Sequence, residues 1–252
     1  MITSFRSSLR AAVFAAAVLL PSGLLAEEFS QEQRDELGPI IRDYLIKNPE
    51  VLREAIAALE MKEKEAAAAA ATAAIGERAE ELYRRDDDLV AGNPDGSVTM
   101  AEFFDYNCGY CKRAMSDVLA LIESDDDLKV VLKEWPILGE GSRFASKAAL
   151  ASKPQGKYWE FHLALMEARS VDEKTTLEVA ERVGLDVEQL KADMESPEVA
   201  AVIDRNMELA QSLGIQGTPA FFIDDQVIPG AVGFKSLSRV IAEVRKEGCT
   251  VC

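Results

Sequence analysis

One stretch of the chain decides the fold: Glu102-Phe103-Phe104-Asp105-Tyr106-Asn107-Cys108-Gly109-Tyr110-Cys111-Lys112. An apolar strand expected at 98–104 runs into a Cys-x-x-Cys turn, and a helical pattern follows over 113–122. A thiol at the start of a helix faces unpaired backbone N–H groups and the positive end of the helix dipole, and both favour the thiolate. Cys-x-x-Cys thiols placed in this way have pKa values of roughly 3.5–7.5. The order strand, cysteine turn and helix therefore predicts redox chemistry.

The two cysteines have different predicted roles. Cys108, at the helix start, is expected to be exposed and to attack, whereas Cys111, one turn later, faces inward and closes the disulfide. The alternative is half of a zinc site, which would need two more cysteine or histidine ligands. The remaining candidates are His162 and the distant pair Cys249 and Cys252. We therefore expect no bound metal ion and no cofactor.

Glu102 is the one carboxylate in an otherwise apolar strand, six residues before Cys108. We predict that it lies beneath the active site and relays protons to and from Cys111 as the disulfide forms and breaks. An exposed position on the other face of the strand is the alternative, because the alternation of side chains does not decide between the two faces.

A second motif, Gly217-Thr218-Pro219, precedes an apolar strand at 220–223. Together, Glu-Phe-Phe-x-Tyr-x-Cys-x-x-Cys, an intervening helical stretch and Gly-Thr-Pro resemble the DsbA-like thiol–disulfide oxidoreductases of the thioredoxin superfamily. The resemblance implies that the Thr218–Pro219 bond is cis and lies beside the cysteines. It also implies a substrate groove to which Thr218, Pro219, Gly109 and Tyr110 contribute.

The first 26 residues have the pattern of a secretory signal peptide. Arg6 and Arg10 precede an apolar run at 11–20, and 24–26 is a suitable cleavage site. The prediction is a cleaved signal and a periplasmic protein, in an oxidising compartment suited to disulfide chemistry. An uncleaved membrane anchor is the alternative.

The composition is that of a soluble globular protein, with 48% hydrophobic and 29% charged residues. The net charge of −16 would repel nucleic acids and anionic lipids. Neither is therefore expected as a partner.

Residues 27–86 form a predicted helical extension and linker. A helix at 29–47 is amphipathic, Asn48-Pro49 starts another, and 61–85 is rich in alanine and charged residues. The apolar stripe of these helices needs a partner surface. The extension resembles the ScsC-type branch, named for suppression of copper sensitivity, whose N-terminal helices can assemble protomers. The resemblance implies a homo-oligomer; the alternative is a monomer whose extension folds back on its own domain.

Residues 87–252 form the predicted catalytic domain. The turn at Asn93-Pro94-Asp95-Gly96 predicts a hairpin of 89–91 with 97–104. A right-handed crossover then leads to a strand at 128–135, a helical insertion occupies about 140–214, and two strands and a helix end the domain. The predicted fold class is α/β, a thioredoxin-like fold with an inserted helical subdomain, preceded by the N-terminal helical extension.

Two features lie outside this scheme. His162 is the only histidine, and we interpret it as a packing or surface residue because a thiolate at a helix start needs no base. The terminal pair Cys249 and Cys252 is a second Cys-x-x-Cys. It fits a local disulfide, a mobile thiol pair that exchanges electrons with Cys108 and Cys111, or a weak metal site.

The predicted function is disulfide exchange with the cysteines of exported proteins through Cys-Gly-Tyr-Cys, as an isomerase. A membrane protein that reduces or oxidises the chain is the expected redox partner. The alternatives are a monomeric DsbA-like oxidase or reductase, and a thiol protein that handles Cu(I), which soft thiolates bind well.

Overall fold

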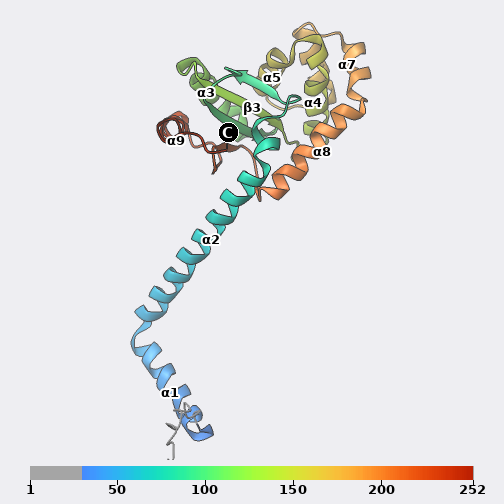
Figure 1. The fold of residues 1–252 in the computed structure, drawn as a ribbon. Coiled ribbons are helices and arrows are strands. Elements are labelled where there is room, and N and C mark those ends of the chain that lie inside the picture. The colour runs from blue at the N-terminus through green and yellow to red at the C-terminus, as the bar shows by residue number, and fades with distance from the viewer. Residues whose placement is uncertain (1–29, 252) are drawn as a thin grey trace, which may run out of the picture. The chain divides into compact units, whose positions relative to one another are not determined.

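The computed structural model describes residues 30–251, and the chain divides into two compact units, Met1–Leu59 and Glu60–Cys252. The predicted signal peptide at 1–26 lies outside the described residues. The elements, labelled in Figure 1 where room allows, are α1 (Gln31–Lys47), α2 (Pro49–Tyr83), β1 (Leu89–Gly92), β2 (Val98–Phe104), α3 (Gly109–Ser124), β3 (Leu128–Glu134), α4 (Glu140–Ala151), the 3-10 turn η1 (Lys153–Gln155), α5 (Tyr158–Glu167), α6 (Glu173–Arg182), α7 (Val187–Met194), α8 (Pro197–Ser212), β4 (Ala220–Ile223), β5 (Gln226–Pro229) and α9 (Phe234–Glu247).

A mixed sheet with the strand order β1-β3-β2-β4-β5 forms the centre of the second unit. Strands β2 and β3 are parallel, and the other neighbouring pairs are antiparallel. Every residue of β2 is buried, because helices cover both faces of the sheet and β2 is its central strand. The thioredoxin-like arrangement predicted from the sequence is confirmed.

The predicted hairpin of 89–91 with 97–104 is wrong. The turn itself is present, with the Gly96 N–H donating to the Asn93 carbonyl at 3.0 Å. However, β3 lies between the two strands, pairing antiparallel with β1 and parallel with β2. The Asn93 N–H donates to Leu128 O at 2.9 Å, so the turn is bonded to the start of β3. Turn residues alone did not reveal that β3 would lie between β1 and β2.

The two faces of the sheet have separate cores. On one face, Met100 and Phe104 of β2 pack with α3, α9 and helices of the insertion. On the other, Ala101 and Phe103 pack with the ends of α2 and α8. Residues Ile75, Ala79, Leu82 and Tyr83 of α2 are all buried there. The expected domain start at 87 therefore lies later than the start of the compact unit at Glu60, because the last turns of α2 complete its core.

Helices α4 to α8 lie between β3 and β4, where an insertion at about 140–214 was predicted. They gather together beside the sheet (Figure 1). The caps follow from the sequence: the side chains of Asp172, Asp186 and Ser196 accept N–H groups at the starts of α6, α7 and α8. Helices α4 to α7 and the first half of α8 pack in the core on the face of the sheet that carries the cysteines, whereas the end of α8 packs on the other face.

The first unit contains α1 and the beginning of α2. Ser30 and Gln33 form a capping box at the start of α1, and the helix ends at Lys47, with Asn48 as its C-cap residue before Pro49. Many apolar side chains of this unit are exposed, among them Ile41 of α1 at 54% and Leu52 of α2 at 47% of their surface. Within 30–251, the helices include none that is both long enough and apolar enough to cross a membrane.

Candidate active site

Asp105 fastens the loop that carries the cysteines. It follows β2 and is fully buried, and its carboxylate accepts the N–H groups of Ile137 at 2.8 Å and Leu138 at 2.9 Å and the Ser142 hydroxyl at 2.7 Å. It also accepts the N–H of Asn107 at 2.7 Å. A carboxylate with four donors holds the loop against the start of α4 and fixes where α3 begins.

Asn107 extends this attachment to the insertion. Its side-chain amide donates to the Val171 carbonyl and the Ser142 hydroxyl, both at 3.0 Å, and its oxygen accepts the Val171 N–H at 2.8 Å. Asp105 and Asn107 were given no role in the sequence prediction. The signal that could have identified them is an Asp-x-Asn pair directly before a helix, since these side chains bond to nearby backbone groups.

Cys108 is the N-cap residue of α3, and Cys111 lies in its first turn. The expectation that Cys108 is exposed is wrong in degree: 7% of its surface is accessible, against 0% for Cys111. The carbonyl of Thr218 covers it, with the Cys108 thiol donating to that oxygen at 3.2 Å. The order of accessibility is as predicted, because the first turn of α3 directs Cys111 into the core.

Burial raises the pKa of the Cys111 thiol well above its ordinary value, and the charge of Glu102 acts in the same direction. Lys112 is a further charged group here; its ammonium group donates to the Ala168 carbonyl. Burial lowers the pKa of Lys112, while Asp105 and the sulfurs of Cys111 and Cys108 oppose that shift. The sequence prediction gave Lys112 no role, although it directly follows the second cysteine.

Glu102 lies on the same face of β2 as Met100 and Phe104, the face that packs on α3. It is fully buried, and neither of its carboxylate oxygens has a hydrogen-bond partner among the described residues. Burial raises its pKa to about 8. The interior position predicted from the sequence is the one found, and at neutral pH the group is largely protonated and uncharged.

Thr218 and Pro219 lie beside the cysteines, and the bond between them is cis. They border an open groove of about 850 Å³. Tyr110, between the two cysteines, is 60% exposed and also lines this groove, with the guanidinium carbon of Arg113 4.2 Å from its ring centroid. Gly109 begins α3. The structure thus gathers the predicted catalytic and substrate-binding residues at one end of the sheet.

His162 packs elsewhere, among aromatic rings and a buried carboxylate. Its ring is stacked on Tyr158 and Trp159, and its Nδ1 lies 3.0 Å from the Tyr106 hydroxyl. Tyr106 and Tyr158 both donate to Glu134 at 2.8 Å. Burial lowers the pKa of His162 to about 3, so the ring is neutral. The interpretation of His162 as a packing residue agrees with this environment.

The C-terminal residues are held by Asp224. Its Oδ1 accepts the N–H groups of Thr250 at 2.7 Å and Val251 at 2.9 Å, and the Thr250 hydroxyl at 2.8 Å. Cys249 is disulfide-bonded. Cys252 lies outside the described residues, so the local disulfide stays a prediction. Residues 30–251 include no group of three or more His, Cys, Asp or Glu side chains arranged to hold a metal ion.

The site has one cysteine at the N-cap of a helix and a second in its first turn, beside a cis proline and near a buried carboxylate on a mixed sheet. These features define the class of thioredoxin-fold proteins with a dithiol site. Comparison with known proteins gives the family. Residues 99–242 match the DSBA-like thioredoxin domain, and residues 33–66 match the copper resistance protein ScsC N-terminal domain. The chain belongs to the DSBA-like family of thiol–disulfide oxidoreductases, in its ScsC-type branch.

Solved structures agree with this assignment. A thioredoxin-like oxidoreductase from Silicibacter pomeroyi is 49% identical with a TM-score of 0.65, over 66% of this chain and 97% of that one. A linker-deletion mutant of Proteus mirabilis ScsC is 28% identical with a TM-score of 0.67, over 87% of this chain and 98% of that one.

Curated relatives match a similar share of the chain. Disulfide bond formation protein D of Bacillus subtilis is 28% identical over 173 residues, which cover 62% of this chain and 77% of the relative. Other matches are to parts of longer proteins. The chain spans only 26% of the length of the Na(+)/H(+) antiporter NhaA of Herminiimonas arsenicoxydans, with 28% identity over 163 residues.

Proposed function

We propose that this chain is a periplasmic thiol–disulfide isomerase that acts on the cysteines of other exported proteins. The observation that carries the proposal is the placement of Cys108 at the start of α3, 3.2 Å from the Thr218 carbonyl, with the fully buried Cys111 one turn behind it. The signal-like pattern of 1–26 supports export.

The first step is attack by the Cys108 thiolate on a client disulfide. A new bond forms between Cys108 and one client sulfur, the client disulfide breaks, and the other client sulfur leaves as a thiolate that takes up a proton. In isomerisation a third client thiolate then attacks the mixed disulfide. A corrected client disulfide forms and Cys108 leaves as a thiolate, so there is no net oxidation or reduction.

The mixed disulfide can also be resolved by Cys111. It attacks Cys108, a Cys108–Cys111 disulfide forms, and the client leaves as a dithiol, so the client is reduced and the chain oxidised. Cys111 must first lose its proton, and its burial makes that loss costly. Glu102 is the group on the same buried face that exchanges this proton. A membrane protein that reduces or oxidises the Cys108–Cys111 pair would complete the cycle.

The exposed apolar stripe of the first unit supports the isomerase form of the proposal. Ile41, Tyr44, Leu52, Ile56 and Leu59 are each between 47% and 56% exposed, which a soluble exported protein would cover by self-association. Several active sites in one assembly would let one thiolate open a wrong disulfide while neighbouring grooves hold the client.

Two assays on the mature chain test the direction of the reaction. One follows refolding of a protein with scrambled disulfides, and the other follows oxidation of the same protein after full reduction. We expect refolding of the scrambled protein to be accelerated more strongly, and Cys108→Ser to abolish the effect. Acceleration of oxidation alone would contradict the isomerase proposal and favour a DsbA-like oxidase.

A further inference from the structure

The last described residues of the chain, 249–251, are bound to the turn between β4 and β5. Oδ1 of Asp224 accepts the N–H groups of Thr250 at 2.7 Å and Val251 at 2.9 Å, and the Thr250 hydroxyl at 2.8 Å. The Cys249 sulfur lies 3.3 Å from the same oxygen. One carboxylate oxygen thus contacts three consecutive residues, which we call the C-terminal segment.

The C-terminal segment is also bound to the end of α2. The Arg84 guanidinium group donates to the Val251 carbonyl at 2.6 Å, and the Val251 side chain packs against the core formed by the end of α2 and the sheet. The Tyr83 hydroxyl donates to the Asp224 carbonyl at 2.6 Å. The turn, the C-terminal segment and the end of α2 therefore form one connected junction.

A disulfide restricts the C-terminal segment. Cys249 is disulfide-bonded, whereas Cys108 and Cys111 are free thiols. The predicted local disulfide would join Cys249 to Cys252, the fourth cysteine of the chain, which lies outside the described residues. A disulfide across two intervening residues limits the conformations that the segment has when it is not bound. It therefore favours the bound conformation that Asp224 holds.

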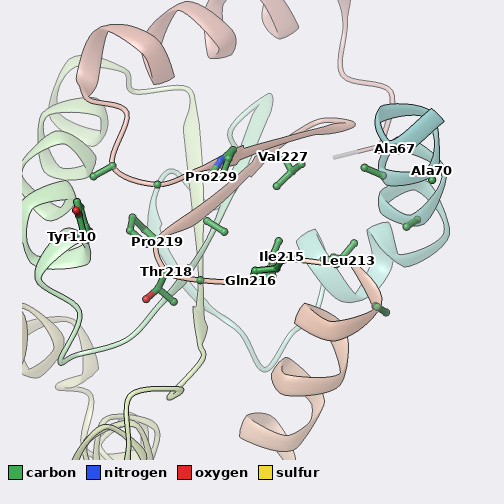
Figure 2. Close-up of a pocket in the computed structure, with 18 residues that line it drawn as sticks. Ala67, Ala70, Tyr110, Leu213, Ile215, Gln216, Thr218, Pro219, Val227 and Pro229 are labelled. Atoms are coloured by element: carbon green, nitrogen blue, oxygen red, sulfur yellow. The ribbon is translucent and has the colours of Figure 1, made fainter. Parts of the chain in front are cut away.

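The active site lies at the other end of the sheet. Strand β4 is antiparallel to β2, so Pro219 lies at the end of the sheet where Cys108 follows β2, and Asp224 lies at the opposite end. Figure 2 shows Pro219 towards Tyr110, and Val227, just beyond the turn on β5, towards α2. From Pro219 to Asp224 the strand advances by roughly 16 Å. A disulfide requires Cα atoms within roughly 7 Å, so the bound segment cannot exchange with Cys108 of the same chain.

We propose that the disulfide of Cys249 is a second redox site, which dithiols reduce and whose reduction frees residues 249–251 from Asp224 and from the end of α2. The substrate class is a dithiol, either a small molecule or a pair of cysteines on another protein. The attachment of α2 to the β4–β5 turn then weakens when the surroundings become reducing. The inference goes beyond the proposed function, since it requires no client bound to Cys108.

The reduction has two steps. A thiolate of the dithiol attacks one sulfur of the disulfide, a mixed disulfide forms, and the other cysteine of the chain leaves as a thiolate that takes up a proton. The second thiol of the reductant then loses its proton and attacks the mixed disulfide, so that the remaining cysteine leaves in the same way. The chain gains two electrons and two protons, and the dithiol becomes a disulfide.

The test uses the full mature chain carrying Cys108→Ser and Cys111→Ser, in which Cys249 and Cys252 are the remaining cysteines. Mixtures of reduced and oxidised dithiothreitol set the redox conditions, with dithiothreitol as the dithiol. Alkylation followed by mass spectrometry gives the reduced fraction of the pair. We expect excess dithiothreitol to reduce the pair while circular dichroism shows that the chain stays folded.

Hydrogen exchange read by mass spectrometry measures whether reduction frees the C-terminal segment. Amide exchange in peptides that cover 76–84 and 249–251 should become about tenfold faster after reduction, because the disulfide no longer restricts the segment. The matched control carries Cys249→Ser and Cys252→Ser in addition. It should exchange at the faster rate with and without dithiothreitol.

Asp224→Asn tests the role of the carboxylate. Asp224 has a φ of 52°, a conformation that asparagine also adopts, so the variant keeps the turn. A neutral acceptor binds N–H groups more weakly than a carboxylate, so exchange in 249–251 should be faster even in the oxidised state. Asp225→Asn removes the same charge from the next residue and should leave the exchange unchanged. If Asp224→Asn does not fold, Arg84→Met, which removes the bond to the Val251 carbonyl at an exposed position, makes the same test.

A pair that stays oxidised in excess dithiothreitol would overturn the inference, as would alkylation of Cys249 before any reductant is added. Complete reduction without faster exchange in either peptide would overturn it too, because the disulfide would then not hold the junction. Failure of the proposed function is a separate outcome, since the chain tested here lacks both Cys108 and Cys111.

Discussion

At the scale of single residues, Glu102 is a carboxyl group fully buried away from water. A carboxyl group with neither a hydrogen-bond partner among the described residues nor solvent around it is stable only when it holds a proton. Its ordinary pKa of 4.5 is raised to about 8 by burial. It can therefore gain and lose a proton near neutral pH, as the proposed proton relay to Cys111 requires.

The same shift predicts how stability depends on pH. Between about pH 4.5 and 8 the folded protein keeps a proton at Glu102 that the unfolded chain releases, so folding is weakened as pH rises through this window. Because glutamine does not ionise, the Glu102→Gln variant does not lose stability in this way as the pH rises. The unfolding free energy of the variant relative to the parent should increase by a few kcal/mol from pH 4.5 to 8, at about 1.4 kcal/mol per pH unit.

Urea unfolding of the reduced proteins at several pH values measures the difference. Glu123→Gln, at an exposed position on α3, is the control and should follow the parent at every pH. Parallel curves for Glu102→Gln and the parent would show that Glu102 is not a buried neutral acid.

The two cysteines should also differ in reactivity. Cys111 is fully buried, and burial raises its pKa, whereas Cys108 lies at the helix start and retains some accessible surface. Alkylation of the reduced protein at mildly acidic pH, read by peptide mass spectrometry, should label Cys108 at least about tenfold faster, since one pKa unit changes the thiolate fraction tenfold. Equal rates at the two sites would refute the division of roles.

At the scale of elements, a buried ion pair secures the end of α2 to the sheet. The Lys133 ammonium group on β3 pairs with Asp88, and it donates to the Glu81 carbonyl at 2.7 Å. The Lys133 and Asp88 side chains are 0% and 2% exposed. Asp87, the neighbouring residue, accepts from Arg205 of α8 at 2.8 Å. The pair thus joins the last turn of α2, the residue before β1, and β3.

Removing one partner of the Lys133–Asp88 ion pair should lower the unfolding free energy strongly. Lys133→Met leaves Asp88 buried without its partner, and we expect a loss of about 3–5 kcal/mol in unfolding free energy. The double variant Lys133→Met with Asp88→Leu should be markedly more stable than the single one, because no uncompensated charge remains. The exposed pair Arg239 and Glu243 provides the control, since Arg239→Met should change stability by less than about 1 kcal/mol.

If the single and double variants were equally destabilised, the ion pair would not be what holds this junction. Denaturant titrations of the three variants and the parent decide the matter.

The helices were more predictable from the sequence than the strand pairing. Helices α6, α7 and α8 begin next to capping residues that a sequence displays directly. The place of β1 was missed because strand order depends on contacts between distant segments, which local turn signals do not contain. The junction of α2 with the sheet was missed for the same reason. The burial of the last turns of α2 depends on distant segments, and an alanine-rich sequence does not show which turns will be buried.

The candidate site was largely predictable, because its chemistry lies in motifs. The cysteines and Glu102 were identified by residue type and spacing, and the place of Thr218-Pro219 beside them was implied by the resemblance to DsbA-like proteins. The low exposure of Cys108 was not predicted, because the carbonyl that covers it belongs to Thr218, 110 residues later in the chain. Asp105 was overlooked because its four donors come partly from a segment more than thirty residues away.

At the scale of the whole molecule, the question is what covers the apolar stripe of the first unit. Deleting residues 27–59 removes that unit and leaves the compact catalytic unit beginning at Glu60. We expect the truncated protein to be monomeric by light scattering, to keep thiol–disulfide exchange and to lose its ability to refold scrambled substrates. A full mature chain that is already monomeric would contradict the assembly and favour a folded-back extension.

We expect the Cys108 sulfur to be the atom through which the chain exchanges disulfides with clients. The most direct measurement traps the intermediate: the mature chain carrying Cys111→Ser is mixed with a scrambled-disulfide protein, quenched with acid and mapped by mass spectrometry. We expect a client peptide joined to Cys108, and no such adduct in the double variant Cys108→Ser with Cys111→Ser. Client peptides joined instead to Cys249 or Cys252, or no mixed disulfide at all, would contradict it.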